Sequence, residues 1–209
     1  MQFRCAIVFA PHTDDGELGC GGTIAKLIDF GIRVIYFGFS AAEESVPNNL
    51  PKDILRKECL LATARLGIPE SDCMILHYKV RNFPSCRQEI LDEMIGINKE
   101  YNPDLIFVPS RTDTHQDHGV ISREGYRAFK RKTILSYELP WNTRHFDATC
   151  LIKLTDTQIR KKISAVSEYS SQKGRDYTDP EAILSLARVR GQQAGCKYAE
   201  AFEVQRMVV

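Results

Sequence analysis

The chain lacks an excess of charge of either sign. Its 28 Lys and Arg residues nearly balance its 27 Asp and Glu residues, leaving a formal net charge of +1 over 209 residues. Proteins that bind a polyanion usually carry a surplus of positive charge, so this balance gives no reason to expect nucleic acid as a partner. Nucleic acid is therefore not the expected partner.

Long apolar runs and paired cysteines are also missing. No stretch approaches the ~20 apolar residues that span a bilayer, and no charged segment followed by an apolar one opens the sequence. The seven cysteines are scattered without any C-x-x-C spacing, as expected of reduced thiols. We therefore expect a cytoplasmic protein with no membrane contact. The length, with 43% hydrophobic residues and no repeat or linker, fits a single domain over residues 1–209.

What the sequence does contain is a regular alternation of apolar, strand-like runs and amphipathic, helix-like stretches. Strands are expected at residues 3–10, 33–39, 74–78, 105–109, 134–139 and 149–154. Helices are expected at residues 23–30, 51–66, 87–100, 119–131, 155–170 and 180–191. Apolar strands joined by crossover helices belong in a parallel sheet covered on both faces. This predicts a Rossmann-like, doubly wound α/β fold, a three-layer sandwich with a mostly parallel central sheet.

Two charged segments follow the first and fourth of these strands. PHTDD follows the first, and RTDTHQDH follows the fourth. In the commonest strand order of such sheets these two strands are neighbours, and ligands bind in the crevice at their carboxyl ends. The segments are therefore expected to meet there and to gather seven side chains: His12, Asp14, Asp15, Asp113, His115, Asp117 and His118.

These residue types are suited to holding a catalytic metal. Two imidazoles and a carboxylate are enough to bind a divalent ion and to leave positions for water and substrate. Because neighbours in an extended loop point in different directions, one of Asp14 and Asp15 can bind metal while the other faces the bound water. Likewise one of His115 and His118 is a ligand and the other a supporting residue. The spacing alone does not decide which.

Two other kinds of site are disfavoured. Ile24 stands where G-x-G-x-x-G needs glycine or alanine, and the next strand does not end in an acidic residue, which argues against a nicotinamide or flavin site. The sequence Gly-Lys-Ser/Thr is also absent, which argues against a P-loop nucleotide site. We instead expect the glycines after Asp15 to let the chain turn tightly beside the metal and to start the first helix close to the sheet. His115 and Asp117 with a distant histidine also resemble the iron triad of non-haem oxygenases. Those enzymes have β-rich folds, whereas this sequence alternates between strand-like and helix-like stretches.

The two segments resemble the motifs of a known family. PHTDDGELGCGGT at residues 11–23 is similar to the first motif of the LmbE-like, or PIG-L, family of zinc-dependent N-acetylglucosaminyl deacetylases, and HQDH at 115–118 is similar to the second. LRKE at 55–58 and KYAEAFEV at 197–204 are similar to weaker family patterns, so the resemblance covers nearly the whole chain. It implies Zn²⁺ as the cofactor, with Fe²⁺ as the alternative.

Carried over position by position, the resemblance also implies roles for the individual residues. The implied zinc ligands are His12, Asp15 and His118. Asp14 is the implied general base for a water whose pKa zinc lowers from ~15.7 to about 7. The implied supporting pair is His115 with Asp117, in which a protonated His115 stabilises the amide oxygen or protonates the departing amine. Acetate and a free amino sugar result.

Two departures from the family pattern concern the site. Thr13 stands where the family usually has a second proline, which we expect to loosen the turn without removing a ligand. Gly119 stands where many members have arginine, which leaves the identity of the substrate open.

Substrate contacts are predicted at two positions. Arg56 matches an arginine that contacts substrate in the family. Trp141, the only tryptophan, follows the fifth strand together with Tyr137 and Pro140 and is placed to stack on a sugar face. The candidate anchors for a phosphate or nucleotide tail are Arg81, Arg87 and Arg190. Loops at 40–50 and 79–85 are expected to close over the ligand.

The expected function is therefore a zinc amidohydrolase that removes the acetyl group from an N-acetylglucosamine-type amino sugar or its conjugate. The expected partner is this small molecule, with a homo-oligomer as a further expectation. One alternative is the same chemistry on another amide, such as a thiol-glycoside conjugate. The other is a metal- or sugar-binding module without turnover, which Asp14 and His115 disfavour because binding alone needs neither.

Overall fold

The computed structural model describes residues 3–208. Its strands are β1 (Cys5–His12), β2 (Arg33–Ser40), β3 (Cys73–Ile75), β4 (Leu105–Pro109), β5 (Thr133–Tyr137), β6 (Cys150–Leu154) and β7 (Tyr198–Arg206). Its α-helices are α1 (Asp15–Asp29), α2 (Ile54–Leu66), α3 (Arg87–Tyr101), α4 (Gln116–Ala128), α5 (Asp156–Ser167) and α6 (Pro180–Gln193). Short 3₁₀ turns are η1 (Glu43–Ser45), η2 (Glu70–Asp72), η3 (Phe83–Cys86), η4 (Ser170–Gln172) and η5 (Asp176–Thr178).

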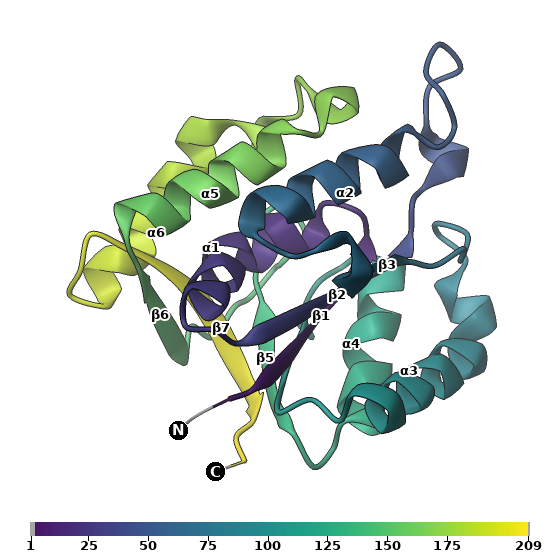
Figure 1. Ribbon diagram of the computed structural model, residues 1–209, viewed down its shortest axis with the longest axis horizontal. Helices are drawn as coiled ribbons and strands as arrows, with labels where there is room; N and C mark the ends of the chain where they lie inside the picture. Colours follow the sequence, from purple (N-terminus) through teal and green to yellow (C-terminus); the bar gives the residue numbers. More distant parts are fainter. Residues whose placement is uncertain (1–2, 209) are drawn as a thin grey trace.

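The strands form one sheet in the order β3-β2-β1-β4-β5-β7-β6 (Figure 1). The pairs from β3 to β5 are parallel, whereas β7 runs antiparallel to both β5 and β6. The mostly parallel sheet and the adjacency of the first and fourth strands are therefore confirmed. β7 is not among the predicted strands, because its alanines and glutamates have low strand propensity and hide the pattern.

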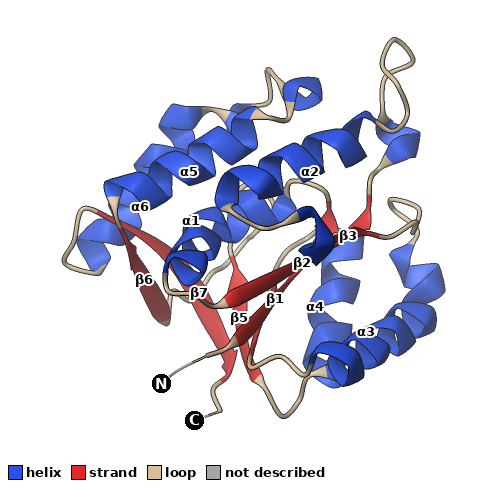
Figure 2. Cartoon of the chain, viewed as in Figure 1, coloured by secondary structure: helices blue, strands red, loops and turns tan. Residues whose placement is uncertain are grey.

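Helices cover both faces of the sheet (Figure 2). α1, α2, α5 and α6 lie on one side, and α3 and α4 lie on the other (Figure 1). Successive side chains of β1 serve the two cores alternately: Ala6 and Val8 belong to the cluster under the first group, and Ile7 and Phe9 to the cluster under the second. The predicted three-layer sandwich is confirmed. Within residues 3–208, none of the helices combines the length and apolar character needed to cross a bilayer.

α1 begins eight residues earlier than predicted, at Asp15 rather than near residue 23. The glycine string is therefore part of the helix and not a tight turn, and its only irregularity inside α1 is a kink at Cys20, where φ is −143°. A Cβ on Gly19 would overlap the ring of Tyr137, so the missing side chain lets α1 lie directly on the sheet. Of the two expected roles of the glycines, the close approach of the helix to the sheet is confirmed and the tight turn is wrong.

α4 also begins earlier than predicted, at Gln116. His115 is its N-cap, and its ring Nδ1 accepts the backbone N–H of Asp117 at 3.2 Å. Histidine is not one of the usual N-cap residues, so the helix start was not recognisable from the sequence. The consequence is that Asp117 and His118 lie in the first turn of a helix rather than in a loop.

The carboxyl-terminal helices begin as predicted. Thr155 and Gln158 form a capping box at the start of α5, and Asp179 caps α6 with Pro180 in its first turn. Gly191, however, does not end α6. A Cβ there would lie 2.6 Å from the carbonyl oxygen of Lys197, so this glycine allows the chain leading into β7 to pass close to the helix.

Candidate active site

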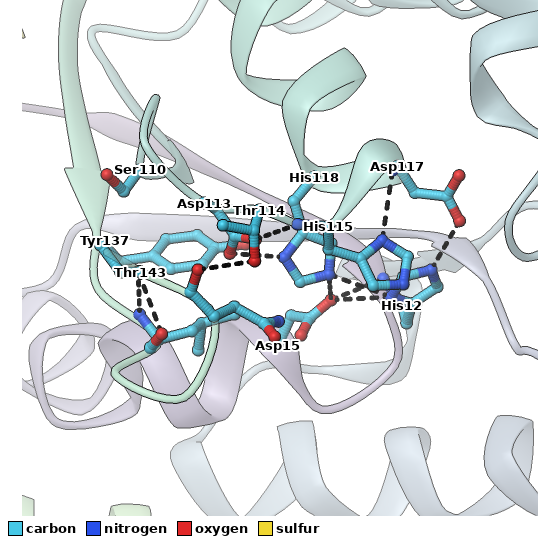
Figure 3. A network of polar contacts seen from close by, with 12 residues as sticks. His12, Asp15, Ser110, Asp113, Thr114, His115, Asp117, His118, Tyr137 and Thr143 are labelled. Carbon is cyan, nitrogen blue, oxygen red and sulfur yellow. Dashed lines mark hydrogen bonds and ion pairs between the residues drawn. The ribbon is translucent and has the colours of Figure 1, made fainter. Parts of the chain in front are cut away.

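The carboxyl ends of β1 and β4 bring the two histidine segments together, as the sequence predicts (Figure 3). His12 is the last residue of β1, Asp15 is the first residue of α1, and His118 lies in the first turn of α4. Side chains that are about half the chain apart in sequence therefore face one another. Their positions are fixed by two buried strands and two helix starts.

Three potential ligand atoms, from His12, Asp15 and His118, form a nearly equilateral triangle. We call it the metal triangle. His12 Nδ1 lies 3.2 Å from Asp15 Oδ2 and 3.2 Å from His118 Nε2. His118 Nε2 in turn lies 3.2 Å from Asp15 Oδ2. Atoms bound to one tetrahedral zinc at about 2.0–2.1 Å are ~3.3 Å from each other, so this triangle fits a metal ion. These are the three residues that the resemblance implied as ligands.

Two further carboxylates orient the two imidazole rings. Asp117 Oδ2 lies 3.0 Å from His12 Nε2, and Asp113 Oδ2 lies 2.8 Å from His118 Nδ1. Because each carboxylate accepts the N–H of one ring nitrogen, the other nitrogen of each ring directs its lone pair into the triangle. Asp117 is itself fully buried and also accepts the backbone N–H of Phe83 at 3.2 Å. Asp113 was expected in this crevice but without a defined role.

His115 is not held as expected. The Asp117 carboxylate binds His12, and it is the Asp117 backbone N–H that donates to His115 Nδ1. The proton of a neutral His115 ring is therefore on Nε2. Burial, and then the neighbouring His118 and His12, lower the pKa of His115, so the neutral ring is favoured over the protonated form that we expected.

His115 also lies near the metal triangle. The three histidines each have a ring nitrogen within 4.8 Å of the others, and the ring of His115 stacks on that of His118 with centroids 4.5 Å apart. Its Nδ1 is engaged by the helix cap, however, and Asp15 already completes the triangle with His12. His115 is therefore better placed as a hydrogen-bond donor beside the metal than as a third ligand.

The carboxylate and the imidazoles of the metal triangle stabilise each other's charged forms. Burial by itself raises the pKa of Asp15, but the charge and hydrogen bonds of His118, and then those of His12, outweigh burial and hold this pKa well below its usual range. Burial opposes protonation of His118, yet the carboxylates of Asp15 and Asp113 raise the pKa of His118 to about 10. The carboxylates thus make a site that attracts a cation, and a metal ion would replace the ring proton.

Asp14 has a different environment from its neighbour Asp15. It is the residue before α1 and has φ 93° and ψ −30°, a left-handed conformation that is strained for any side chain. Among the described residues its carboxylate makes no cap bond to the helix. Burial, and then the charges of Asp15 and Glu17, raise the pKa of Asp14 well above its usual value. Asp14 therefore holds a proton more readily than an ordinary aspartate, in contrast to Asp15.

The metal triangle lies in a cleft of about 340 Å³. Trp141 lines this cleft, is 43% exposed, and stacks on Tyr177 with ring centroids 4.5 Å apart. Both aromatic residues also line an adjoining, mainly apolar cavity of about 330 Å³. Tyr137, by contrast, is fully buried and donates its hydroxyl to the carbonyl of Phe9, so it is a core residue.

Comparison with known proteins identifies the family. Residues 7–129 match the PIG-L family model, which is described as GlcNAc-PI de-N-acetylase, and this span contains all three atoms of the metal triangle. The chain belongs to the PIG-L family. A curated relative, the probable N-acetyl-alpha-D-glucosaminyl L-malate deacetylase 2 of Bacillus cereus, is 30% identical over 146 residues, which are 63% of this chain and 63% of the relative.

Solved structures share the fold of this PIG-L chain. The N,N'-diacetylchitobiose deacetylase of Pyrococcus horikoshii has a TM-score of 0.82 at 23% identity, covering 98% of this chain and 84% of that chain. The 4-carboxy-2-hydroxymuconate hydratase of Pseudomonas putida has a TM-score of 0.77 at 17% identity, covering 99% and 98%. A deacetylase and a hydratase thus use the same fold, so the reaction must be argued from the site.

Most of the arginines singled out from the PIG-L sequence lie outside the cleft. Each of three pairs with a carboxylate: Arg56 with Glu43, Arg87 with Glu124, and Arg190 with Glu138. The guanidinium of Arg56 also donates to the carbonyls of Ile75 and Leu76, both at 2.7 Å. Its predicted contact with substrate, like that of Trp141, stays a prediction. Arg81 does line the cleft.

Thr13, which departs from the family pattern, makes a backbone hydrogen bond beside the metal triangle. The backbone N–H of Thr13 donates to the carbonyl of Ser40 at 3.1 Å and so continues the pairing of β1 with β2. Proline has no N–H and cannot make this bond. Thr13 therefore links the turn to β2, and the expected loosening of the turn stays a prediction.

Several residues that line the cleft were not predicted. They are Asn142, Gln172, Arg175 and Tyr177. Gln172 and Arg175 lie at the irregular connection between α5 and α6, where η4 and η5 interrupt the chain. No motif marks this connection, because its contribution to the cleft depends on how α5 and α6 pack and not on local sequence.

Proposed function

We propose that this PIG-L chain is a metal-dependent hydrolase that removes the N-acetyl group from an N-acetylglucosamine-type amino sugar or its conjugate. The observation that carries the proposal is the metal triangle of His12, Asp15 and His118, with Asp14 and His115 in the same cleft. Membership in a family described as a de-N-acetylase and the likeness to a named deacetylase support the same reaction.

The atoms that would hold the metal are His12 Nδ1, Asp15 Oδ2 and His118 Nε2. Two imidazoles and one carboxylate suit zinc, and ferrous iron is the alternative. When bound, zinc polarises a carbonyl group and lowers the pKa of water to about 7. Asp117 and Asp113 keep the two rings in the required orientation.

The chain's own side chains then move the protons. Asp14 accepts a proton from the attacking water, whose hydroxyl adds to the acetyl carbon. His115 donates a hydrogen bond from Nε2 to the amide oxygen as negative charge develops there. When the carbon–nitrogen bond breaks, Asp14 delivers its proton to the departing nitrogen. Water and the N-acetyl amide are thus converted into acetate and a free amino sugar.

The direct test is acetate release by purified protein loaded with Zn²⁺ or Fe²⁺. The substrates are N-acetylglucosamine, its methyl glycoside, its thiol-glycoside and a simple N-acetylated amine without a sugar. We expect acetate and free amine in equal amounts from the sugar substrates. Release from the simple amide alone would assign the chemistry to another amide, and a metal-loaded protein that releases no acetate from any of them would refute the proposal. Hydration of an unsaturated dicarboxylate is assayed in parallel, because a hydratase shares the fold.

A further inference from the structure

We propose that Arg81 and Arg175 together bind an anionic group, a carboxylate or a phosphate, carried by the amino-sugar substrate. The proposal rests on the proposed function, because it names the class of substrate that the same cleft takes. Both arginines line the cleft that contains the metal triangle. They come from different segments, the connection after β3 and the connection between α5 and α6.

Half of the fourteen other arginines have their charge balanced by a carboxylate of the described residues, and the two cleft arginines do not. Seven arginines in the described part of the chain pair with carboxylates: Arg4, Arg33, Arg56, Arg65, Arg87, Arg127 and Arg190. Neither Arg81 nor Arg175 has such a partner within residues 3–208. Of the acidic residues that line the cleft, Asp15 belongs to the metal triangle, and Asp14 makes no ion pair with either arginine, although burial raises its pKa and the charge of Arg175 lowers it. Two guanidinium charges therefore remain available at the cleft wall.

Arg175 is held in place by aromatic residues and not by a charge. Its Nη1 donates to the hydroxyl of Tyr177 at 2.6 Å, and its guanidinium lies 5.8 Å from the centre of the Tyr177 ring. Tyr177 in turn stacks on Trp141. This arrangement orients the cation while leaving its other N–H groups without a partner in the described chain. The guanidinium of Arg175 is therefore oriented, and its remaining N–H donors can bind an anion.

Arg81 is tied to the metal site through its backbone. Its N–H donates at 2.5 Å to Asp117 Oδ2, the oxygen that also contacts His12. Its φ is 67°, a left-handed conformation in which glycine is favoured over any residue with a side chain. A side chain at such a position points to function. The guanidinium makes one side-chain contact, from Nη2 to Ser45 Oγ at 3.2 Å.

The chemistry of the ligand follows from these two groups. A guanidinium presents parallel N–H donors that match the two oxygens of a carboxylate or phosphate, and two guanidinium groups from opposite segments prefer an anion to a hydroxyl. The acetamido group must lie at the metal triangle, where hydrolysis takes place. The substrate is therefore an N-acetyl amino sugar whose other end, at Arg81 and Arg175, is negatively charged.

The test compares charged and neutral substrates of the same sugar. The probes are N-acetylglucosamine 1-phosphate, the N-acetylglucosaminide of glycolate, and methyl N-acetylglucosaminide, so that phosphate and carboxylate are distinguished. For each probe, kcat/KM and the calorimetric Kd are measured with metal-loaded protein at low and high salt. Variants are Arg81→Gly, Arg175→Gln and, as control, Arg160→Gln, an exposed residue on α5 outside the cleft.

We expect the wild-type chain to prefer at least one anionic probe by about 10-fold or more, with the preference weakening at high salt. Arg81→Gly and Arg175→Gln should each lower the ratio of anionic to neutral kcat/KM about 10-fold, whereas Arg160→Gln should keep it. Because glycine suits a left-handed φ, Arg81→Gly should keep its unfolding midpoint within about 3 °C of the wild type.

Two results would overturn the proposal. The first is a wild-type chain that shows no preference for either anionic probe. The second is a pair of variants that lose affinity for charged and neutral probes equally, which would make the arginines merely structural. If no probe releases acetate, the proposed function fails by itself. The arginine site is then decided by calorimetric binding of the same probes to the wild type and the variants.

Discussion

Asp14 and Asp15 are adjacent and chemically identical, yet their surroundings give them opposite proton affinities. His118 and His12 hold the pKa of Asp15 far below its usual range, whereas burial and the charge of Asp15 raise the pKa of Asp14. The helix start separates them: Asp15 has helical geometry, and Asp14 has φ 93°. One carboxylate is therefore suited to a metal and the other to proton transfer.

The role of Asp14 predicts a sharp split between chemistry and metal binding. Asp14→Asn should lower kcat by about 10²- to 10⁴-fold, because the amide cannot accept the proton of water. Its metal content should stay at the wild-type level, since Asp14 supplies no atom to the triangle. Acetate release and elemental analysis of the same sample measure both. A variant that turns over normally with metal bound would show that Asp14 is not the base.

The role of Asp113 predicts the reverse split. Asp113→Asn keeps an acceptor for His118 Nδ1 but removes the charge that makes the ring a stronger ligand. Zinc affinity should fall by about 10- to 100-fold, as measured by competition with a chromogenic chelator. Asp147→Asn is the matched control, because the side chain of Asp147 is 72% exposed and, within residues 3–208, pairs only with His145. Equal zinc affinities of the two variants would contradict the assignment.

Side-chain partners were the least predictable feature at this scale. The identities of His12, Asp15 and His118 follow from motif and resemblance, and their geometry fits a metal ion. The partner of Asp117 does not follow, because it depends on the residue at which α4 begins. The helix begins three residues earlier than predicted, and the Asp117 carboxylate contacts His12 instead of the predicted His115.

At the scale of elements, α1 shows why local propensity is misleading. Each glycine inside a helix costs about 1 kcal/mol relative to alanine, so a glycine-rich stretch predicts a turn. In the molecule, contact with the sheet outweighs this cost, because Gly19 lies against the ring of Tyr137. The approach of α1 to the sheet also fixes where Asp15 stands, so the packing of this helix is part of the site.

Two glycine substitutions separate packing from propensity. Gly19→Ala should destabilise the fold by about 1–3 kcal/mol, because its Cβ overlaps the buried Tyr137 ring. Gly96→Ala in α3 meets nothing within 4 Å and should stabilise the fold by about 0.5–1 kcal/mol. Urea unfolding measures both variants. If Gly19→Ala proves as stable as Gly96→Ala, the close contact of α1 with the sheet is refuted.

At the scale of the whole molecule, the alternation of strands and helices was enough to predict the sheet, its strand order around β1 and the crevice at β1 and β4. The cleft wall was not predictable. Arg175 and Tyr177 reach it from the irregular connection before α6, and β7 enters the sheet between β5 and β6 with a weak strand pattern. Both depend on long-range packing, which leaves no local periodicity.

The metal triangle joins distant parts of the molecule and should therefore stabilise the whole fold. Metal at about 1,000 times its Kd adds ~4 kcal/mol of unfolding free energy, which raises the unfolding midpoint of a chain of this size by roughly 8–16 °C. Removing metal with a chelator should reverse the shift. His118→Ala should show almost no metal-dependent shift, because it removes a ligand atom. Calorimetry with and without chelator measures both, and an equal shift in the variant would place the metal elsewhere.

The most direct test of the central claim is a titration of metal-free protein with Zn²⁺ while acetate release from an N-acetylated amino sugar is recorded. If His12, Asp15 and His118 hold one catalytic ion, activity should rise from near zero in proportion to added zinc and level off at one ion per chain. Activity that is already full without metal, or that does not respond to zinc, would contradict the account.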